Sequence, residues 1–142
     1  MTNRDLVEKK LAFLQRIVKE LRTEARPDRI EHDLREQRFV ERELQLAIQA
    51  ALDVASHIIS DERLEEPATN AALFATLARH GFVPASLRNP LERMAKFRNI
   101  LVHGYADVDL AIVRDVVEHH LDDLEGFVTA IQARVAGGDT KR

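Results

Sequence analysis

The sequence predicts an all-α protein, an antiparallel four-helix bundle with one additional short helix. Glycine and proline, which interrupt regular structure, are sparse, with five and four in 142 residues. Apolar residues recur at three- and four-residue spacing over most of the chain, which is the helical period, and no strand-like alternation competes with it. The length suits a single helical domain, which we place at residues 1–136, followed by a flexible C-terminal tail at 137–142.

Two long helices are expected in the first half, at residues 3–23 and 28–60. The first should end before Pro27 because proline interrupts a helix. The second has a broad apolar face between Leu44 and Ile59, and at 1.5 Å per residue it is about 50 Å long. The first has the narrow apolar stripe of antiparallel packing, formed by Val7, Leu11, Leu14, Val18 and Leu21.

A charged connection at residues 61–69 leads to the additional short helix, at residues 70–80. Thr69 or Asn70 can serve as its N-cap, since both side chains accept hydrogen bonds from free helical N–H groups. Gly81 should close this helix, because glycine readily adopts the left-handed conformation common at helix ends.

The two remaining helices fill the rest of the chain. One should begin at Asn89-Pro90, a good N-cap before a proline in the first turn, and end near His103 with Gly104 in the left-handed conformation. The other should open at Asp107 or Asp109 and continue without a break to about residue 135, because its apolar residues keep a seven-residue repeat.

Composition excludes several functions. The absence of cysteine rules out thiol chemistry, disulfides and thiolate metal sites, and the Glu-x-x-His spacing of di-metal bundles does not occur, so we expect no metal and no cofactor. No segment approaches the roughly 18 apolar residues of a membrane span, and we expect a cytoplasmic protein. A net charge of -3 argues against a general nucleic-acid coat, so any RNA contact must be local.

Residues 88–105, RNPLERMAKFRNILVHGY, are the most informative segment. At 100° per residue Arg98 falls inside the apolar arc of its helix, so burying that face also removes a guanidinium from water. Such a group requires an anion nearby. Two readings are equally open: an Asp or Glu of a neighbouring helix forms a buried ion pair, or the anion is a substrate phosphate, which suits the planar fork of arginine.

Asn99 and His103 are four residues apart and therefore share a face of the same helix. His103 is about 140° around the helix from Arg98, so the two converge on one ligand only if the helix unwinds or a second subunit contributes. Histidine is a natural proton carrier in RNA cleavage, while arginine stabilises charge on phosphorus. The alternative is an idle histidine at a helix C-terminus.

Positive charge gathers in the same segment. Arg88, Arg93, Lys96 and Arg98 stand against one carboxylate, Glu92, which gives a net charge of +3. Arg93 and Lys96 are therefore candidate RNA contacts. The equally weighted alternative is that these cations pair with acidic residues of the last helix, namely Asp107, Asp109, Asp115, Glu118, Asp122, Asp123 and Glu125.

A second polar pair lies on the long helix. Asp53 and His57 are four residues apart and point roughly opposite its main apolar face. They are candidates for a supporting role in a cleft between two subunits. An ordinary solvated pair is the competing interpretation.

The run from Arg98 through four residues to His103-Gly104-Tyr105 resembles the R-x4-6-H-x-Y motif of HEPN toxins of the HepT type. The resemblance implies a helical fold, a homodimer with the motifs at its interface, Arg98 and His103 as the RNase pair, and Asn99 orienting them. It also implies a partner, a minimal nucleotidyltransferase antitoxin that transfers AMP to Tyr105, the only tyrosine in the chain.

Three hypotheses follow. The first is the toxin of a toxin-antitoxin system, a metal-independent RNA endonuclease silenced by its antitoxin. The second is a non-catalytic HEPN subunit that binds nucleotide or RNA and docks a nucleotidyltransferase. The third is a purely structural bundle, which would require Arg98 to be paired with a carboxylate of its own chain.

Overall fold

The computed structural model describes residues 3–104 and 108–140, and every regular element within them is helical. The prediction of an all-α fold is therefore confirmed. In chain order the elements are α1 (Arg4–Glu24), the 3-10 turn η1 (Pro27–Arg29), α2 (Leu34–Asp61), α3 (Asn70–Arg79), α4 (Ala85–His103), α5 (Leu110–His119) and α6 (Leu121–Thr140).

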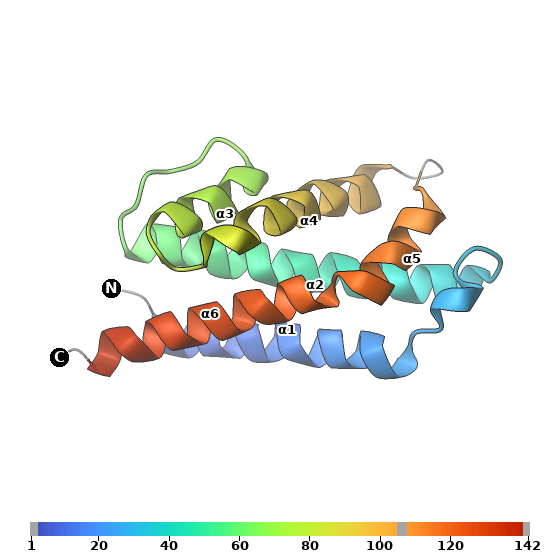
Figure 1. The fold of residues 1–142 in the computed structure, drawn as a ribbon, viewed down its shortest axis with the longest axis horizontal. Coiled ribbons are helices and arrows are strands. Elements are labelled where there is room, and N and C mark those ends of the chain that lie inside the picture. The colour runs from blue at the N-terminus through green and yellow to red at the C-terminus, as the bar shows by residue number, and fades with distance from the viewer. Residues whose placement is uncertain (1–2, 105–107, 141–142) are drawn as a thin grey trace.

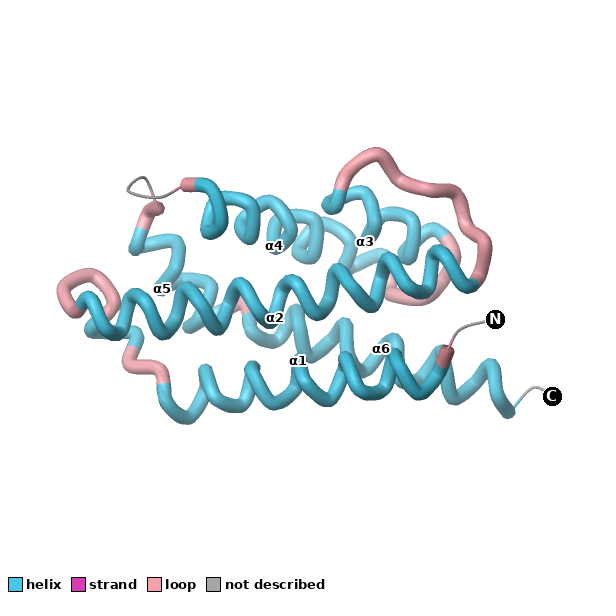
Figure 2. Tube along the Cα trace, turned by 180° about the vertical axis from the view of Figure 1, so that it is seen from behind, coloured by secondary structure: helices cyan, strands magenta, loops and turns pink. Residues whose placement is uncertain are grey.

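Three long helices, α1, α2 and α6, lie side by side, and α3 and α4 cover the remaining side of α2 (Figure 1). In the opposite view α2 is nearest the viewer and lies between α1 on one side and α3 with α4 on the other (Figure 2). The two phenylalanines at the centre, Phe74 of α3 and Phe127 of α6, are fully buried and meet edge to face at 5.7 Å between centroids. The helices thus share one core.

The predicted apolar stripe of α1 is confirmed, because all five of its residues are buried. The predicted start of the second helix at 28 was wrong: α2 begins at Leu34. Pro27–Arg29 form a 3-10 turn instead, and Ile30 is fully buried after it. The Asp33 carboxylate accepts hydrogen bonds from the N–H groups of Arg35 and Glu36, so this cap sets the helix start.

The short helix α3 agrees closely with its prediction. The Thr69 hydroxyl accepts a hydrogen bond from the Ala72 N–H at 3.2 Å and caps the helix. Gly81 follows the helix end at φ +78°, the left-handed conformation that favours glycine.

The predicted start of the fourth helix at Asn89-Pro90 was wrong, because α4 begins at Ala85 with Pro84 as its cap residue. Phe82 and Val83 are buried just before it, so their burial moves the helix start toward the N-terminus. Pro90 is the sixth residue of α4, beyond the first turn, so α4 lacks the hydrogen bond that an N–H at this position would donate to the Ser86 carbonyl. The predicted left-handed Gly104 was also wrong: it is right-handed, at φ -77° and ψ -20°.

The single last helix predicted from the seven-residue repeat is two helices. Asp109 caps α5 by accepting a hydrogen bond from the Ala111 N–H, while Asp107 lies outside the described residues. The chain breaks at His120, at φ -121° and ψ 3°, so that α5 packs on η1 and α2 whereas α6 runs along α1 and α4. The apolar repeat continues through the break, which is why periodicity missed it.

Among the described residues no helix is long and apolar enough to cross a membrane. The boundary placed at residue 136 stays a prediction.

Candidate functional site

The predicted site residues Arg98, Asn99 and His103 all lie in the last turns of α4. The helix ends where the Gly104 N–H donates to the Ile100 carbonyl at 2.7 Å. A Cβ at Gly104 would lie 2.5 Å from that oxygen, so this close turn requires glycine. The glycine therefore ends the helix tightly, one residue after His103.

Arg98 is half-buried, as its position in the apolar arc predicts. Its Nε atom is enclosed and has no hydrogen-bond partner, and its Nη1 donates to the Asn99 side-chain oxygen at 3.2 Å. No carboxylate within residues 3–104 and 108–136 forms an ion pair with it. A buried donor without a partner costs about 1–3 kcal/mol, so this guanidinium is suited to an external anion.

Asn99 and His103 are both exposed. The structure brings Asn99 against Arg98, but in the described part of the chain no hydrogen bond joins His103 to either residue. Within one chain, then, the geometry assembles an arginine–amide pair with an exposed imidazole one turn further on.

Two of the other cations of α4 also lack a carboxylate partner among the described residues. Arg88 bonds to Glu92 at 2.9 Å, whereas Arg93 and Lys96 are exposed and form no ion pair with the described residues. The predicted alternative, neutralisation by the last helix, is wrong for the described carboxylates. These are engaged elsewhere: Asp109 caps α5, Glu118 binds Arg114, Asp122 and Glu125 bind Arg22, and Asp115 and Asp123 bind histidines.

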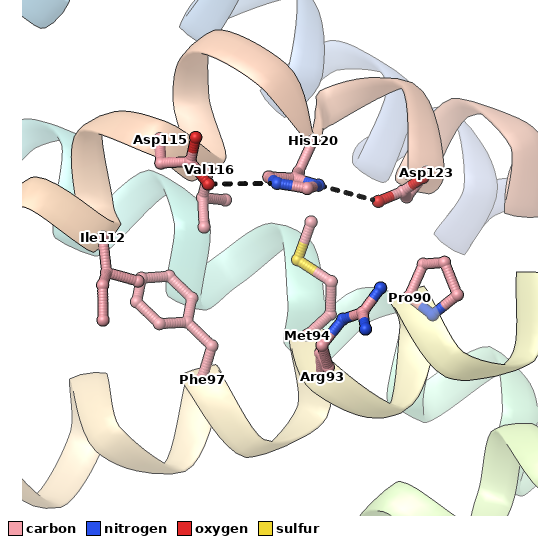
Figure 3. Close-up of a pocket in the computed structure, with 9 residues that line it drawn as sticks. All are labelled: Pro90, Arg93, Met94, Phe97, Ile112, Asp115, Val116, His120 and Asp123. Carbon is pink, nitrogen blue, oxygen red and sulfur yellow. Dashed lines mark hydrogen bonds and ion pairs between the residues drawn. The ribbon is translucent and has the colours of Figure 1, made fainter.

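A hollow of about 170 Å³ separates α4 from the junction of α5 and α6 (Figure 3). Along one side His120 lies between two carboxylates, 3.1 Å from Asp115 and 3.3 Å from Asp123. Asp115 also bonds to His119 at 3.0 Å, and this bond and the neighbouring His120 lower the pKa of its carboxyl. The residues lining the hollow are Pro90, Arg93, Met94, Phe97, Ile112, Asp115, Val116, His120 and Asp123.

Sequence analysis did not find this histidine cluster, because adjacent histidines diverge on a continuous helix. His119 lies four residues after Asp115 within α5 and shares its face, whereas the break at His120 turns the second ring toward the same carboxylate. Only the spacing of Asp115, His119 and Asp123 was visible in the sequence.

Asp53 and His57 lie in a groove of about 350 Å³ between α1 and α2. Asp53 accepts from Gln49 at 2.8 Å and from Lys10 at 3.4 Å, and the His57 Nε2 lies 3.1 Å from Asp61. The C-terminal half of α2 that carries them runs beneath α3, whereas α4 ends near α5 (Figure 1). Within one chain, no hydrogen bond or ion pair of the described residues links Asp53 or His57 to the motif, so the supporting role of this pair stays a prediction.

Tyr105 lies outside the described residues. Its modification by AMP stays a prediction.

A helical bundle with an Arg-x4-His motif near the end of its fourth helix defines a HEPN-type ribonuclease class. Residues 10–131 match the family described as ribonuclease HepT-like, and the chain belongs to that family. The mRNA nuclease HepT of Shewanella oneidensis is 32% identical over 130 residues, 91% of this chain and 98% of that protein. The tRNA nuclease HepT of Aphanizomenon flos-aquae is 35% identical over 74 residues, 52% and 50% of the two chains.

Comparison with solved structures agrees with this family assignment. The chain is 31% identical to the tri-AMPylated Shewanella oneidensis HEPN toxin in complex with MNT antitoxin, with a TM-score of 0.83 over 94% of this chain and 99% of that one. A toxin-antitoxin complex with AMP-PNP gives 0.84 at 32% identity, covering 91% and 98%. YutE from Bacillus subtilis, 18% identical, shares the fold with a TM-score of 0.87 over 96% and 93%. The predicted family and its class of ribonucleases are confirmed.

Proposed function

We propose that this protein is a toxin of a toxin-antitoxin system that cuts RNA through Arg98 and His103 without requiring a metal ion. The observation that carries the proposal is the half-buried Arg98 guanidinium, which has no carboxylate partner in the described part of the chain. In a family of ribonucleases, the anion that suits this group is a phosphate of RNA.

The reaction uses the 2′-OH of the substrate as the nucleophile. An imidazole of His103 removes its proton, the 2′-oxygen bonds to phosphorus, and the bond from phosphorus to the 5′-oxygen breaks. The leaving oxygen takes a proton from an imidazolium, so the products are a 2′,3′-cyclic phosphate and a 5′-hydroxyl. Arg98 stabilises the negative charge on phosphorus, and Asn99 holds the guanidinium through its 3.2 Å bond.

A homodimer completes this site in the proposal. Arg98 and His103 project about 140° apart, so a second copy supplies the imidazole that one chain cannot bring to the same phosphate. Arg93 and Lys96 would contact RNA, and Asp53 and His57 would support the cleft.

Silencing is proposed to follow the relatives that form complexes with an MNT antitoxin, one of them tri-AMPylated. Transfer of AMP to Tyr105 would place a bulky anion two residues after His103 and block RNA by occupying the cationic site. Such a partner and an RNA substrate support a cytoplasmic location, which is part of the proposal.

The test is cleavage of a mixed cellular RNA pool in EDTA by the purified protein. Arg98→Ala and His103→Ala should each abolish cleavage, whereas the matched exposed residues Arg63→Ala and His32→Ala should leave it unchanged. All variants are compared at equal helicity and equal oligomeric state. No cleavage by a protein whose intact mass shows Tyr105 unmodified would overturn the nuclease and favour the docking subunit instead.

A further inference from the structure

The first half of α2 carries a row of arginines on its solvent side. Arg35, Arg38 and Arg42 are spaced by three and four residues, so they share one helical face, and all three are exposed. At 1.5 Å per residue the row extends for about 10 Å.

The neighbouring carboxylates leave this row mostly unneutralised. Glu36 accepts a hydrogen bond from the Arg26 backbone N–H at 2.7 Å, and Glu43 faces Glu20 of α1. Glu41, which is half-buried, lies 3.6 Å from the exposed Arg38, and a pair with one solvated partner neutralises the arginine only weakly.

Arg35 and Arg42 form no ion pair with any residue that the structure describes. Further along the same face Asp53 is engaged with Lys10 and Gln49, so the positive charge is confined to the first half of α2.

This row faces the same side of the molecule as the motif. α2 and α4 are antiparallel, so α2 begins beside the end of α4 (Figure 2). Phe97 lines the hollow toward α5 (Figure 3), and Asn99 lies about 200° from it around α4. Asn99 therefore points away from α5 and α6, toward the side on which the exposed face of α2 lies.

We propose that Arg35, Arg38 and Arg42 form a track for the backbone of single-stranded RNA, leading from the motif along α2. The proposal rests on the nuclease function and names how its substrate is held. A single strand fits because attack by the 2′-oxygen in line with the 5′-oxygen requires a backbone free of duplex geometry. Aromatic residues make up only 5% of the chain, so phosphate contacts rather than base stacking carry the binding.

The experiment measures anisotropy of a fluorescein-labelled 20-nucleotide single-stranded RNA over a series of KCl concentrations. All proteins carry His103→Ala to prevent cleavage. The test variant adds Arg35→Gln and Arg42→Gln, and the control adds Lys9→Gln and Lys19→Gln, which removes two charges from the exposed face of α1. Loss of two phosphate contacts should weaken binding at least tenfold and reduce the slope of log K against log salt by about 1.4.

An unchanged slope in the arginine variant, or an equal change in the lysine control, overturns the track. A change of oligomeric state in place of the slope overturns it too, since the arginines would then belong to a subunit interface. If the parent cleaves RNA but the arginine variant shows no slope change, the RNA track is contradicted and the nuclease function is not. If the arginine variant shows a slope change but the unmodified parent does not cleave RNA, the nuclease function is contradicted and the RNA track is not.

Discussion

Two charged surfaces of this protein lie close together and differ in how their charges are satisfied. On α5 and α6 the acidic side chains bind Arg22, Arg114, His119 and His120. On the end of α4, Arg93, Lys96 and Arg98 form no ion pair with the described residues, although acidic helices pack nearby. The difference indicates that the first set of charges serves the fold and that the second is available to a ligand.

The largest effect is expected at Arg98. Arg98→Lys keeps the charge but loses the planar fork, so cleavage should fall about 100-fold while thermal stability stays close to that of the parent. The measurement is the initial rate on labelled RNA. Arg114→Lys, at a cation already bound to Glu118, is the control, and an equal loss of rate there would erase the distinction between the surfaces.

The next prediction concerns two neighbouring carboxylates outside both surfaces, Glu20 of α1 and the partly buried Glu43 of α2. Burial, with Glu20 beside it, raises the pKa of Glu43 to about 7. The folded state therefore holds this proton more tightly than the unfolded state, and stability falls as the pH rises from about 4.5 through 7.

Glu43→Gln should stabilise the protein at pH 8 by about 1 kcal/mol, less than the full shift implies because the side chain is partly solvated, and should have little effect at pH 4.5. Urea unfolding at the two pH values measures this. Glu24→Gln, exposed at the end of α1, should show no such difference. A gain equal at both pH values would contradict the protonation argument.

Arg22 joins α1 to α6 through Asp122 at 2.6 Å and Glu125 at 2.7 Å. Arg22→Ala should lower the unfolding free energy by about 0.5–1 kcal/mol at low salt, and less at high salt, without changing cleavage. Denaturant unfolding at two salt concentrations checks this, with exposed Lys19→Ala as control. A loss of cleavage would show that the paired surface also acts on RNA.

The smallest effect is expected at Glu65. A hydrogen bond to its own backbone, with further bonds to Arg79 and His80, lowers the pKa of this carboxyl to about 2. Its contribution to stability is present above pH 4.5 and is lost as the pH falls toward 2. Between pH 6 and 3 the Tm of Glu65→Gln should therefore fall less than that of the parent. Glu66→Gln should follow the parent, and identical falls in all three would contradict this link between the connection and α3.

Patterns among residues close together in the sequence predicted much of the fold. The stripe of α1 and the Thr69 cap depend on residues within a few positions of one another, so the sequence contains them in full. The starts of α2 and α4 do not, because several residues compete as caps and the winner depends on what else is buried. α2 begins after Asp33 rather than at residue 28 because Ile30 is buried in the core. α4 begins at Ala85 rather than at Asn89 because Phe82 and Val83 are buried just before it.

The candidate site divides in the same way. The sequence by itself determined the helical class, the order of the helices and the presence of Arg98, Asn99 and His103 on one helix end, since these follow from composition and spacing along a few turns. Tertiary structure alone decided which charges remain free. Arg22 meets Glu125 across 103 positions and the break at His120 brings its ring to Asp115, so the described carboxylates that the sequence offered to α4 are already engaged. Ion pairing depends on distances of a few ångströms between residues far apart in the chain, and only packing sets those distances.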